Sequence, residues 1–166
     1  MDDVRITRIQ VNEIGPLWLT ESARGLCRLA FKNPGSPPRL KKGVCIGRMA
    51  YNDTKGDVRT KKMTMAKLCS MKADISGGTP FQRAVWRAIS SIPPGETRSY
   101  AWVARKAGRP RAIRAAANAC GANPLPIIIP CHRVVSSDGS LGGFSSGLAI
   151  KRKLLALEGH RSFGRT

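Results

Sequence analysis

Apolar and polar residues alternate along residues 4–32 with a period of two, which is the pattern of half-buried β-strands. Three runs carry the alternation, at residues 4–9, 17–20 and 26–31. Gly15-Pro16 and the segment 22–25 interrupt it with residues typical of turns. We therefore predict a small antiparallel sheet at the start of the chain.

The alternation is lost after residue 32. Residues 33–42 are rich in proline and glycine, and we expect an exposed loop there. Residues 43–77 are basic, contain methionine and have few large apolar side chains, so we expect one helix within 58–72 and irregular structure elsewhere. Gly77-Gly78 marks the expected end of a first domain.

A helical period begins at Thr79-Pro80, which combines a capping residue with a first-turn proline. Apolar side chains then recur on one helical face, at Phe81, Val85, Trp86 and Ile89. The run Pro93-Pro94-Gly95 ends this helix. We therefore expect residues 78–166 to form a second, mostly helical domain. A sheet domain followed by a helical domain gives the fold class α+β.

Two further short helices follow and suggest a helix-turn-helix. Ser99 caps the first, with Tyr100, Val103 and Ala104 facing inward, and the run at 108–110 breaks it. The second is expected from about Arg111 to Cys120. A purely structural corner between helices has the same pattern, so the motif alone does not establish DNA binding.

The third helix has an unusual composition. Arg111 and Arg114 are expected in its first turns, and small residues fill most of the rest: Ala112, Ala115, Ala116, Ala117, Ala119 and then Gly121. Small side chains suit tight packing against a neighbouring helix. They equally suit close approach to a narrow groove of nucleic acid, where an arginine could enter the base stack. Both interpretations stay open here.

The charge favours the second interpretation. The chain has 29 Lys and Arg against 10 Asp and Glu, a net charge of +19, which predicts an anionic partner and nucleic acid before any other. An anionic membrane surface is the runner-up, but we find neither a long basic amphipathic helix nor an apolar span of membrane length. The acidic start Met1-Asp2-Asp3 does not resemble a secretory signal.

The cysteines indicate a reducing compartment, because there are five of them at irregular spacing. We expect Cys27, Cys45, Cys69 and Cys120 to be structural or incidental thiols, with Cys120 partly exposed. The sequence has two histidines and neither CxxC nor HExxH, so it gives little support to a zinc site.

The remaining cysteine, Cys131, lies in the run Pro130-Cys131-His132-Arg133 after the apolar residues 127–129, where we expect a buried strand or extended segment to end. A thiol becomes a nucleophile when a base or a positive charge is close to it. Adjacency does not prove such a pair, and an inert core thiol is the simpler explanation. Downstream, 142–147 reads as a glycine- and serine-rich binding loop. A last helix is expected from Lys151 to Glu158, with the core contacts Leu154, Leu155 and Leu157.

Several of these motifs together resemble the O6-alkylguanine-DNA alkyltransferase family, also called methylated-DNA–protein-cysteine methyltransferases. The resemblance covers about residues 79–160. It is carried by Pro130 to Val134, Asn123-Pro124 and the run 154–160, with Phe81-Gln82, Val85-Trp86, Gly95-Glu96 and Ser99-Tyr100 upstream. The first 32 residues are similar to the N-terminal strands of the family. Residues 33–77 depart from its pattern, so the expected ribonuclease-H-like domain, 1–77, is atypical there.

The resemblance implies DNA repair by direct, irreversible and stoichiometric transfer of an alkyl group from O6-alkylguanine to Cys131. His132 would deprotonate Cys131 through a bound water, and Glu158 would orient His132. Asn123 would bridge the helix-turn-helix to the Cys131 segment. Tyr100 would contact the flipped base and donate a proton to guanine O6. Neither cofactor nor metal is implied, and the zinc of some relatives lacks its histidine ligands here.

The resemblance also implies a DNA surface and a substrate pocket. Arg114 would replace the extruded nucleotide while the third helix lies in the minor groove. The other DNA contacts expected are Arg111, Ala112, Ala115, Ser99, Tyr100, Gly121 and Arg133. The pocket residues expected are Tyr100, Val134, Phe144, Ser145 and Ser146. Phe144 stands where many relatives carry tyrosine, so a hydrogen bond from that phenol is missing.

Two other functions compete. A DNA-binding protein of the same fold could recognise the alkylated base without repairing it, but relatives of that kind replace the acceptor cysteine, which is present here. A cysteine hydrolase would need an oxyanion hole and would leave the charge unexplained. We expect a monomer that acts on double-stranded DNA in the cytoplasm, or in the nucleus of a eukaryote. Repair of O4-alkylthymine and cooperative binding stay open.

Overall fold

The computed structural model describes residues 5–32 and 60–160. The chain divides into two compact units, Met1–Gly77 and Gly78–Thr166. The loop expected at 33–42, and most of the segment expected to be irregular, lie outside the described residues. No helix in the described part of the chain has the length and apolar character needed to cross a membrane.

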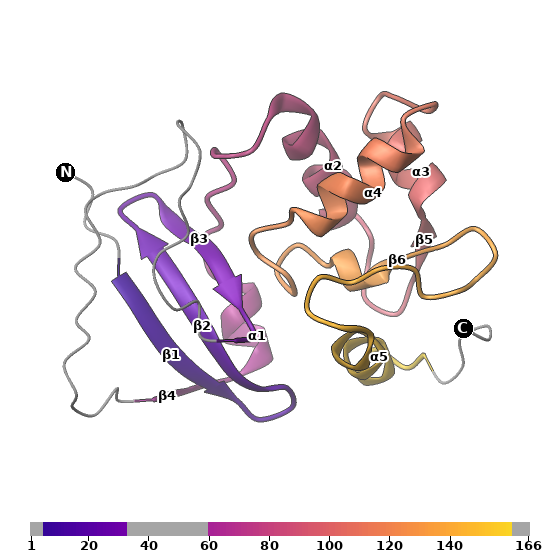
Figure 1. The fold of residues 1–166 in the computed structure, drawn as a ribbon. Coiled ribbons are helices and arrows are strands. Elements are labelled where there is room, and N and C mark those ends of the chain that lie inside the picture. The colour runs from indigo at the N-terminus through magenta and orange to yellow at the C-terminus, as the bar shows by residue number, and fades with distance from the viewer. Residues whose placement is uncertain (1–4, 33–59, 161–166) are drawn as a thin grey trace. The chain divides into compact units, whose positions relative to one another are not determined.

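The first unit is built on a four-stranded sheet (Figure 1). The strands are β1 (Arg5–Val11), β2 (Gly15–Ser22), β3 (Gly25–Ala30) and β4 (Lys61–Met63), in the order β3-β2-β1-β4. The predicted antiparallel pairing of the first three is confirmed. β4 runs parallel to β1, so the sheet is mixed, which the sequence analysis did not predict. Gly15-Pro16 is not the turn, because Gly15 pairs with Val11 at the start of β2.

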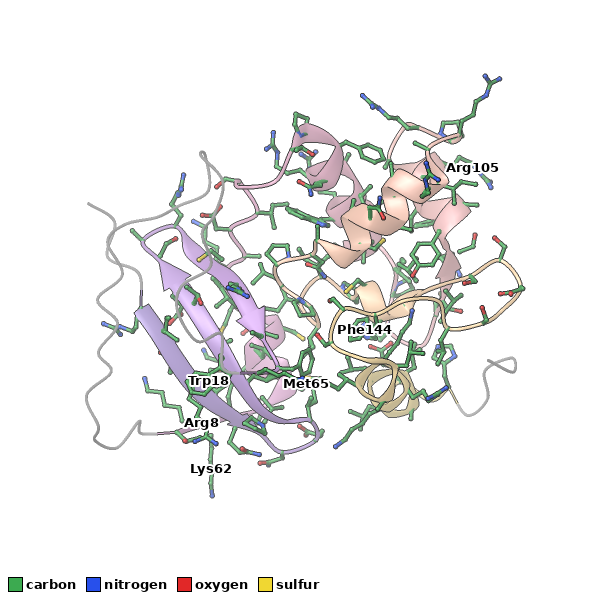
Figure 2. The ribbon with its side chains drawn as sticks, in the orientation of Figure 1. Arg8, Trp18, Lys62, Met65, Arg105 and Phe144 are labelled. Carbon is green, nitrogen blue, oxygen red and sulfur yellow. The ribbon has the colours of Figure 1, made fainter. Side chains whose placement is uncertain are left out.

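One face of this sheet is apolar and buried. Ile9 pairs with Leu17, and Leu19 pairs with Leu29, so that alternate residues of neighbouring strands meet on the same side. The predicted helix is the short α1 (Met65–Cys69), whose Leu68 is fully buried. On β1 and β2, Arg8 lies over the ring of the half-buried Trp18, 5.8 Å from its centroid (Figure 2).

The second unit is helical, as predicted. α2 (Pro80–Ser90) begins at Thr79, whose hydroxyl accepts from Gln82 N while the Gln82 side chain accepts from Thr79 N. α3 (Tyr100–Lys106) begins at Ser99, as predicted. α4 is Ile113–Gly121 and α5 is Leu148–Leu157. The two-residue strands β5 (Arg98–Ser99) and β6 (Val134–Val135) pair in parallel.

Helix α4 has two different faces. Ala116 and Ala119 are buried, and the indole Nε1–H of Trp86 donates to Ala119 O at 2.9 Å, which ties α2 to α4. Arg114 and Ala115 lie on the exposed face. The alanine-rich composition therefore allows tight packing on the buried face of α4. On the exposed face, short side chains such as that of Ala115 would let another molecule come close to the helix backbone.

Several expectations for this unit are wrong. α4 begins at Ile113 and not at Arg111, because residues 109–112 form a turn closed by Ala112 N donating to Arg109 O. Leu157 is 51% exposed at the end of α5 and is not one of the buried core residues. Cys120 is buried at 7% exposure. Trp86, on the predicted apolar face of α2, is a core residue as expected.

Candidate active site

The reactive segment begins in a tight turn, and not in the strand expected from residues 127–129. Ile127 has a φ of 80°, in the left-handed region that a β-branched residue rarely occupies. Ile129 N donates to Leu125 O at 2.8 Å, and Cys131 N donates to Ile129 O at 2.7 Å. The chain then enters the one-turn 3₁₀ helix η1 (Cys131–Arg133). This turn fixes Cys131 at the start of η1, with 7% of its surface exposed.

Asn123 holds the thiol in place. Its Nδ2 donates to Cys131 Sγ at 3.0 Å and to Ile129 O at 2.8 Å, while its Oδ1 accepts from Leu125 N at 3.0 Å. All polar atoms of this amide are therefore used within the segment that follows α4. The structure brings Asn123 and Cys131 together, as the sequence analysis expected.

His132, Arg133 and Glu158 form a second polar group behind the thiol. His132 Nε2 lies 3.0 Å from Glu158 Oε1. Arg133 donates from Nε to Oε2 at 2.9 Å, from Nη2 to Oε1 at 2.7 Å, and from Nη1 to Ile92 O at 2.6 Å. Only 12% of the Arg133 side chain is exposed, so the structure does not support the expected DNA contact of Arg133.

The hydrogen bonds of this group determine its protonation. Burial would raise the pKa of Glu158, but hydrogen bonds and charge from His132 and Arg133 lower it to about 2, so the carboxylate is ionised. Burial, together with the charges of Arg133 and Lys151, lowers the pKa of His132 against the opposing effect of Glu158, so the imidazole is neutral at pH 7. A neutral imidazole facing a carboxylate must donate from Nε2, which leaves Nδ1 with its lone pair free.

His132 Nδ1 is buried and has no hydrogen-bond partner among the described residues. A buried nitrogen lone pair without a partner is rare in proteins. It is the feature expected of a general base that waits for a proton. Burial raises the pKa of the Cys131 thiol above its ordinary value, so the resting sulfur is protonated and needs such a base.

Lys151 is a functional candidate that the sequence analysis missed. It is 0% exposed, and its Nζ donates to Val134 O at 2.6 Å and to Leu141 O. The sequence does contain a sign that Lys151 is buried, because it shares a helical face with Leu154 and Leu155 at spacings of three and four. The sequence predicts Lys151 at the start of the last helix, where a lysine is normally solvated, but the helix begins at Leu148 and Lys151 lies inside it.

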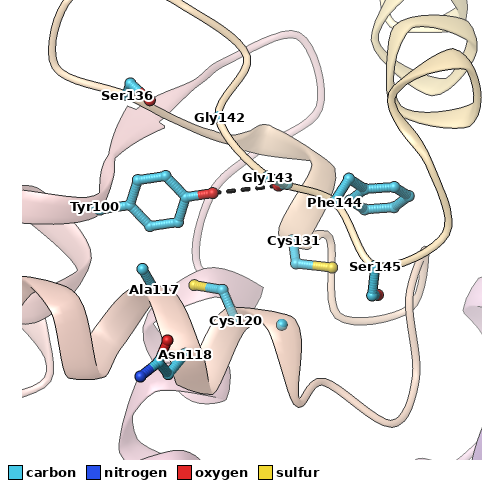
Figure 3. A pocket seen from close by; sticks show the side chains of 11 residues that line it. Tyr100, Ala117, Asn118, Cys120, Cys131, Ser136, Gly142, Gly143, Phe144 and Ser145 are labelled. Atoms are coloured by element: carbon cyan, nitrogen blue, oxygen red, sulfur yellow. Dashed lines mark hydrogen bonds between the residues drawn. The ribbon is translucent and has the colours of Figure 1, made fainter.

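A cavity of about 500 Å³ opens beside Cys131 (Figure 3). It is lined by Tyr100, Ala117, Asn118, Cys120, Gly121, Cys131, Ser136, Gly142, Gly143, Phe144 and Ser145. Tyr100 donates from its hydroxyl to Gly143 O at 3.3 Å, which links α3 to the glycine-rich loop. Burial raises the pKa values of Tyr100 and Cys120 to about 12, so both are neutral.

The cavity contains part of the predicted pocket. Tyr100, Phe144 and Ser145 line it, as expected. Val134 does not, because it is fully buried and hydrogen-bonds through its carbonyl to Lys151. Ser146 is also not among the lining residues. Cys120 also lines the cavity, although the sequence pattern predicts only a structural or incidental thiol there.

Some of the predicted DNA-binding residues are exposed, whereas others are already engaged in hydrogen bonds of the fold. Arg114, Ala115 and Gly121 are exposed on α4. Arg111 and Ala112 lie in the turn before α4, at a surface hollow of about 410 Å³ that they share with Arg109 and Pro110. The Ser99 hydroxyl already accepts from Trp102 N at 3.2 Å as the cap of α3. Among the residues that the structure describes, no group of three or more His, Cys, Asp or Glu is arranged to hold a metal ion.

Comparison with known proteins agrees with this geometry. The family described as "6-O-methylguanine DNA methyltransferase, DNA binding domain" matches residues 80–160. A methylated-DNA–protein-cysteine methyltransferase of Methanosarcina barkeri is 57% identical over 87% of this chain and 91% of that protein. One from Methanosarcina acetivorans is 52% identical, over 49% of this chain and 53% of that protein.

Solved structures give the same result. The crystal structure of the Mycobacterium tuberculosis OGT in complex with DNA is similar to this chain with a TM-score of 0.67. The two are 31% identical, and the match covers 92% of this chain and 91% of that one. The likeness therefore extends over both units, including the sheet that the family match at 80–160 leaves out.

Proposed function

The chain belongs to the methylated-DNA–protein-cysteine methyltransferase family, and we propose that it repairs O6-alkylguanine in DNA by moving the alkyl group onto its own Cys131. The surroundings of Cys131 are the observation that supports this residue as the alkyl acceptor. Cys131 lines the cavity, its sulfur accepts from Asn123 Nδ2, and the next residue has an unpartnered ring nitrogen backed by Glu158.

The proton of Cys131 leaves first. His132 Nδ1 takes it through one bridging water, and the resulting imidazolium is stabilised by the ionised Glu158 at 3.0 Å. Arg133 keeps both oxygens of Glu158 in position. The thiolate accepts from Asn123 Nδ2, which favours the charged sulfur without blocking its open side.

The transfer is an in-line displacement at the alkyl carbon. The thiolate electron pair forms the new S–C bond as the C–O6 bond breaks, and the electron pair of that bond passes to guanine. The displaced guanine anion takes up one proton, which balances the proton that Cys131 gave to His132, and it stays in the DNA strand as the normal base. The hydroxyl of Tyr100, neutral and lining the cavity, supplies a hydrogen bond to the departing O6.

The product explains why each molecule reacts once. An S-alkylcysteine is a thioether, and the groups around Cys131 are a neutral amide and an imidazole, neither of which can cleave it. The protein is therefore a stoichiometric acceptor.

Access to the lesion requires the base to leave the duplex, at a cost of a few kcal/mol. Arg114, exposed on α4, takes the place of the extruded nucleotide, and the low surface around Ala115 permits close approach. A net charge of +19 supplies the attraction to phosphates. Complex formation between the M. tuberculosis OGT and DNA supports this partner. All the groups named lie in one chain, so a monomer suffices.

In the part of the chain that the structure describes, Cys27, Cys120 and Cys131 form no disulfide, which suits a reducing compartment. We infer the cytoplasm, or the nucleus if the source is eukaryotic.

Intact mass spectrometry after incubation with a duplex containing O6-methylguanine tests the function. We expect one methyl group per protein, mapped to Cys131, and none with undamaged duplex. Cys131→Ser should accept no methyl group and still bind DNA, whereas Cys69→Ser, which changes an exposed thiol, should react like the wild type. Lesion-selective binding without any mass change would show a sensor without repair activity.

A further inference from the structure

Lys151 is a buried cation that the alkyl transfer described above does not use. Lysine is almost never fully buried without a partner, because removing its charge from water is costly. Here the side chain is 0% exposed, and its two hydrogen-bond acceptors are main-chain carbonyls, not a carboxylate. Ordinary core packing would be served better by an apolar residue of similar length.

The two carbonyls belong to different walls of the site. Val134 O follows directly after η1, which carries Cys131 and His132. Leu141 O lies at the start of the loop segment 141–145, which supplies Gly142, Gly143, Phe144 and Ser145 to the cavity. Lys151 is therefore bonded at once to the strand behind the nucleophile and to the loop in front of it.

The loop segment has few other attachments and little room to move. Tyr100 donates to Gly143 O at 3.3 Å, and Gly147 N donates to Phe144 O at 3.0 Å. Gly142 has a φ of 63°, and a side chain there would begin 3.0 Å from Tyr100 Cε2 and from Ser136 Oγ. A small displacement of this segment would therefore close or distort the cavity.

We propose that Lys151 is a positioning residue that clamps the loop segment 141–145 against the Cys131 segment and so sets the width of the substrate pocket. The proposal rests on the proposed function, since it assigns a purpose to the pocket. Lys151 acts through the loop and has no contact with the reacting atoms.

The test is the single-turnover reaction with free O6-benzylguanine, which needs the pocket but not DNA. Lys151→Met removes both hydrogen bonds at nearly constant volume. We expect the half-saturating O6-benzylguanine concentration to rise about tenfold, as for the loss of charge-assisted hydrogen bonds. The rate at which iodoacetamide modifies Cys131, mapped by mass, should fall by less than this, because that small reagent does not need the loop and senses only the lost charge of Lys151, which lowers the pKa of the Cys131 thiol.

Two further variants keep the test decisive. Lys151→Gln retains N–H donors without charge and should give a smaller rise; if Lys151→Met does not fold, this variant carries the test. Lys153→Met removes an exposed charge from the same helix and should react like the wild type.

Three results would separate the explanations. Half-saturation unchanged in both Lys151 variants would overturn the clamp. The clamp would also be wrong if the half-saturating O6-benzylguanine concentration stayed the same while the pH profile of iodoacetamide modification shifted. That result would mean that Lys151 stabilises the charge of the Cys131 thiolate, in the neighbourhood of Cys120 and His132. A wild-type protein that takes neither a benzyl group from free O6-benzylguanine nor a methyl group from the O6-methylguanine duplex on Cys131 would instead contradict the proposed function.

Discussion

The two units of the chain bury similar apolar side chains but differ in the polar groups they bury. In the described part of Met1–Gly77, the buried polar side chains include Thr20, at 5% exposure, and Asp74, whose carboxylate is 8% exposed and pairs with the half-exposed Arg24. In the described part of Gly78–Thr166, His132 is 2% exposed, Lys151 is 0% exposed, and the side chain of Glu158 is 16% exposed. The first unit therefore pairs its buried carboxylate with an arginine at the surface, whereas the second unit buries a histidine and a lysine in its interior.

This difference shows where the fold gives up stability for function. Burying an ionisable group costs several kcal/mol unless partners compensate. The second unit compensates with a hydrogen-bonded group of His132, Arg133 and Glu158, and with two carbonyls for Lys151. One atom, His132 Nδ1, is left without a partner, and it lies where the proposed reaction needs a base.

The largest expected effect comes from breaking that group. Glu158→Gln should slow methyl transfer from an O6-methylguanine duplex by roughly 10²–10³-fold, because His132 loses its orientation and the stabilisation of its charged form. Single-turnover quench measurements at pH 7.5 give the rate. In the wild type the rate should fall only below pH 6.5, because burial holds the pKa of His132 under its ordinary value and the neutral base persists above that pKa.

Glu96→Gln is the matched control. Glu96 is a carboxylate of the same unit, 45% exposed and paired with Arg98, and its removal should leave the transfer rate within about twofold, as for an exposed ion pair. Equal rates in the two variants would contradict the role of Glu158. Stability should also separate them. The pKa of Glu158 is lowered to about 2, so its stabilisation is present above its unfolded pKa and is lost as pH falls from about 4.5 to 2.

The elements of the fold were predictable where local chemistry is strong. Thr79-Pro80 and Ser99 are capping signals that need no tertiary partner, and both helices begin where they indicate. α4 has no side-chain cap, so its start at Ile113 depends on the preceding turn and was misplaced. β4 is three residues long and is specified by pairing with β1, which sequence periodicity does not reveal.

The site was predictable to the extent that its residues belong to a contiguous motif. Cys131, His132, Asn123 and Glu158 come together as the resemblance implied. Arg133 and Val134 belong to the same motif, but their side chains turn inward, and the side-chain direction in a one-turn helix is set by packing. Lys151 was missed because its partners are main-chain carbonyls, which leave no trace in the sequence.

An intermediate effect is expected at the exposed surface of the second unit. Arg114→Ala should slow repair in duplex DNA by about 10–100-fold at saturating duplex, because extruding the base costs a few kcal/mol that the arginine offsets. The rate with free O6-benzylguanine should not change, since that substrate needs no extrusion. The ratio of the two rates is the quantity to measure.

Arg87→Ala controls for the loss of one positive charge, because Arg87 is exposed on α2 and not on α4. Its ratio of duplex to free-base rate should equal that of the wild type. If Arg114→Ala slows both substrates equally, Arg114 supports the fold of α4 and takes no part in base extrusion.

The smallest effect on transfer should come from the core of the first unit, although its effect on stability is large. Leu17 is fully buried on β2 opposite Ile9, and Leu17→Ala should destabilise that unit by about 2–5 kcal/mol through the lost apolar contacts and the cavity left behind. At a temperature where the variant stays folded, its rate with free O6-benzylguanine should match the wild type, because every group assigned to the chemistry lies in the second unit. Leu17→Met keeps the volume and should cost less than about 1.5 kcal/mol. Thermal unfolding and the transfer rate are measured on the same samples. A transfer rate that falls in step with stability while the protein is still folded would mean that the apolar sheet also supports the reactive site, and the contrast between the two units would then be one of composition and not of function.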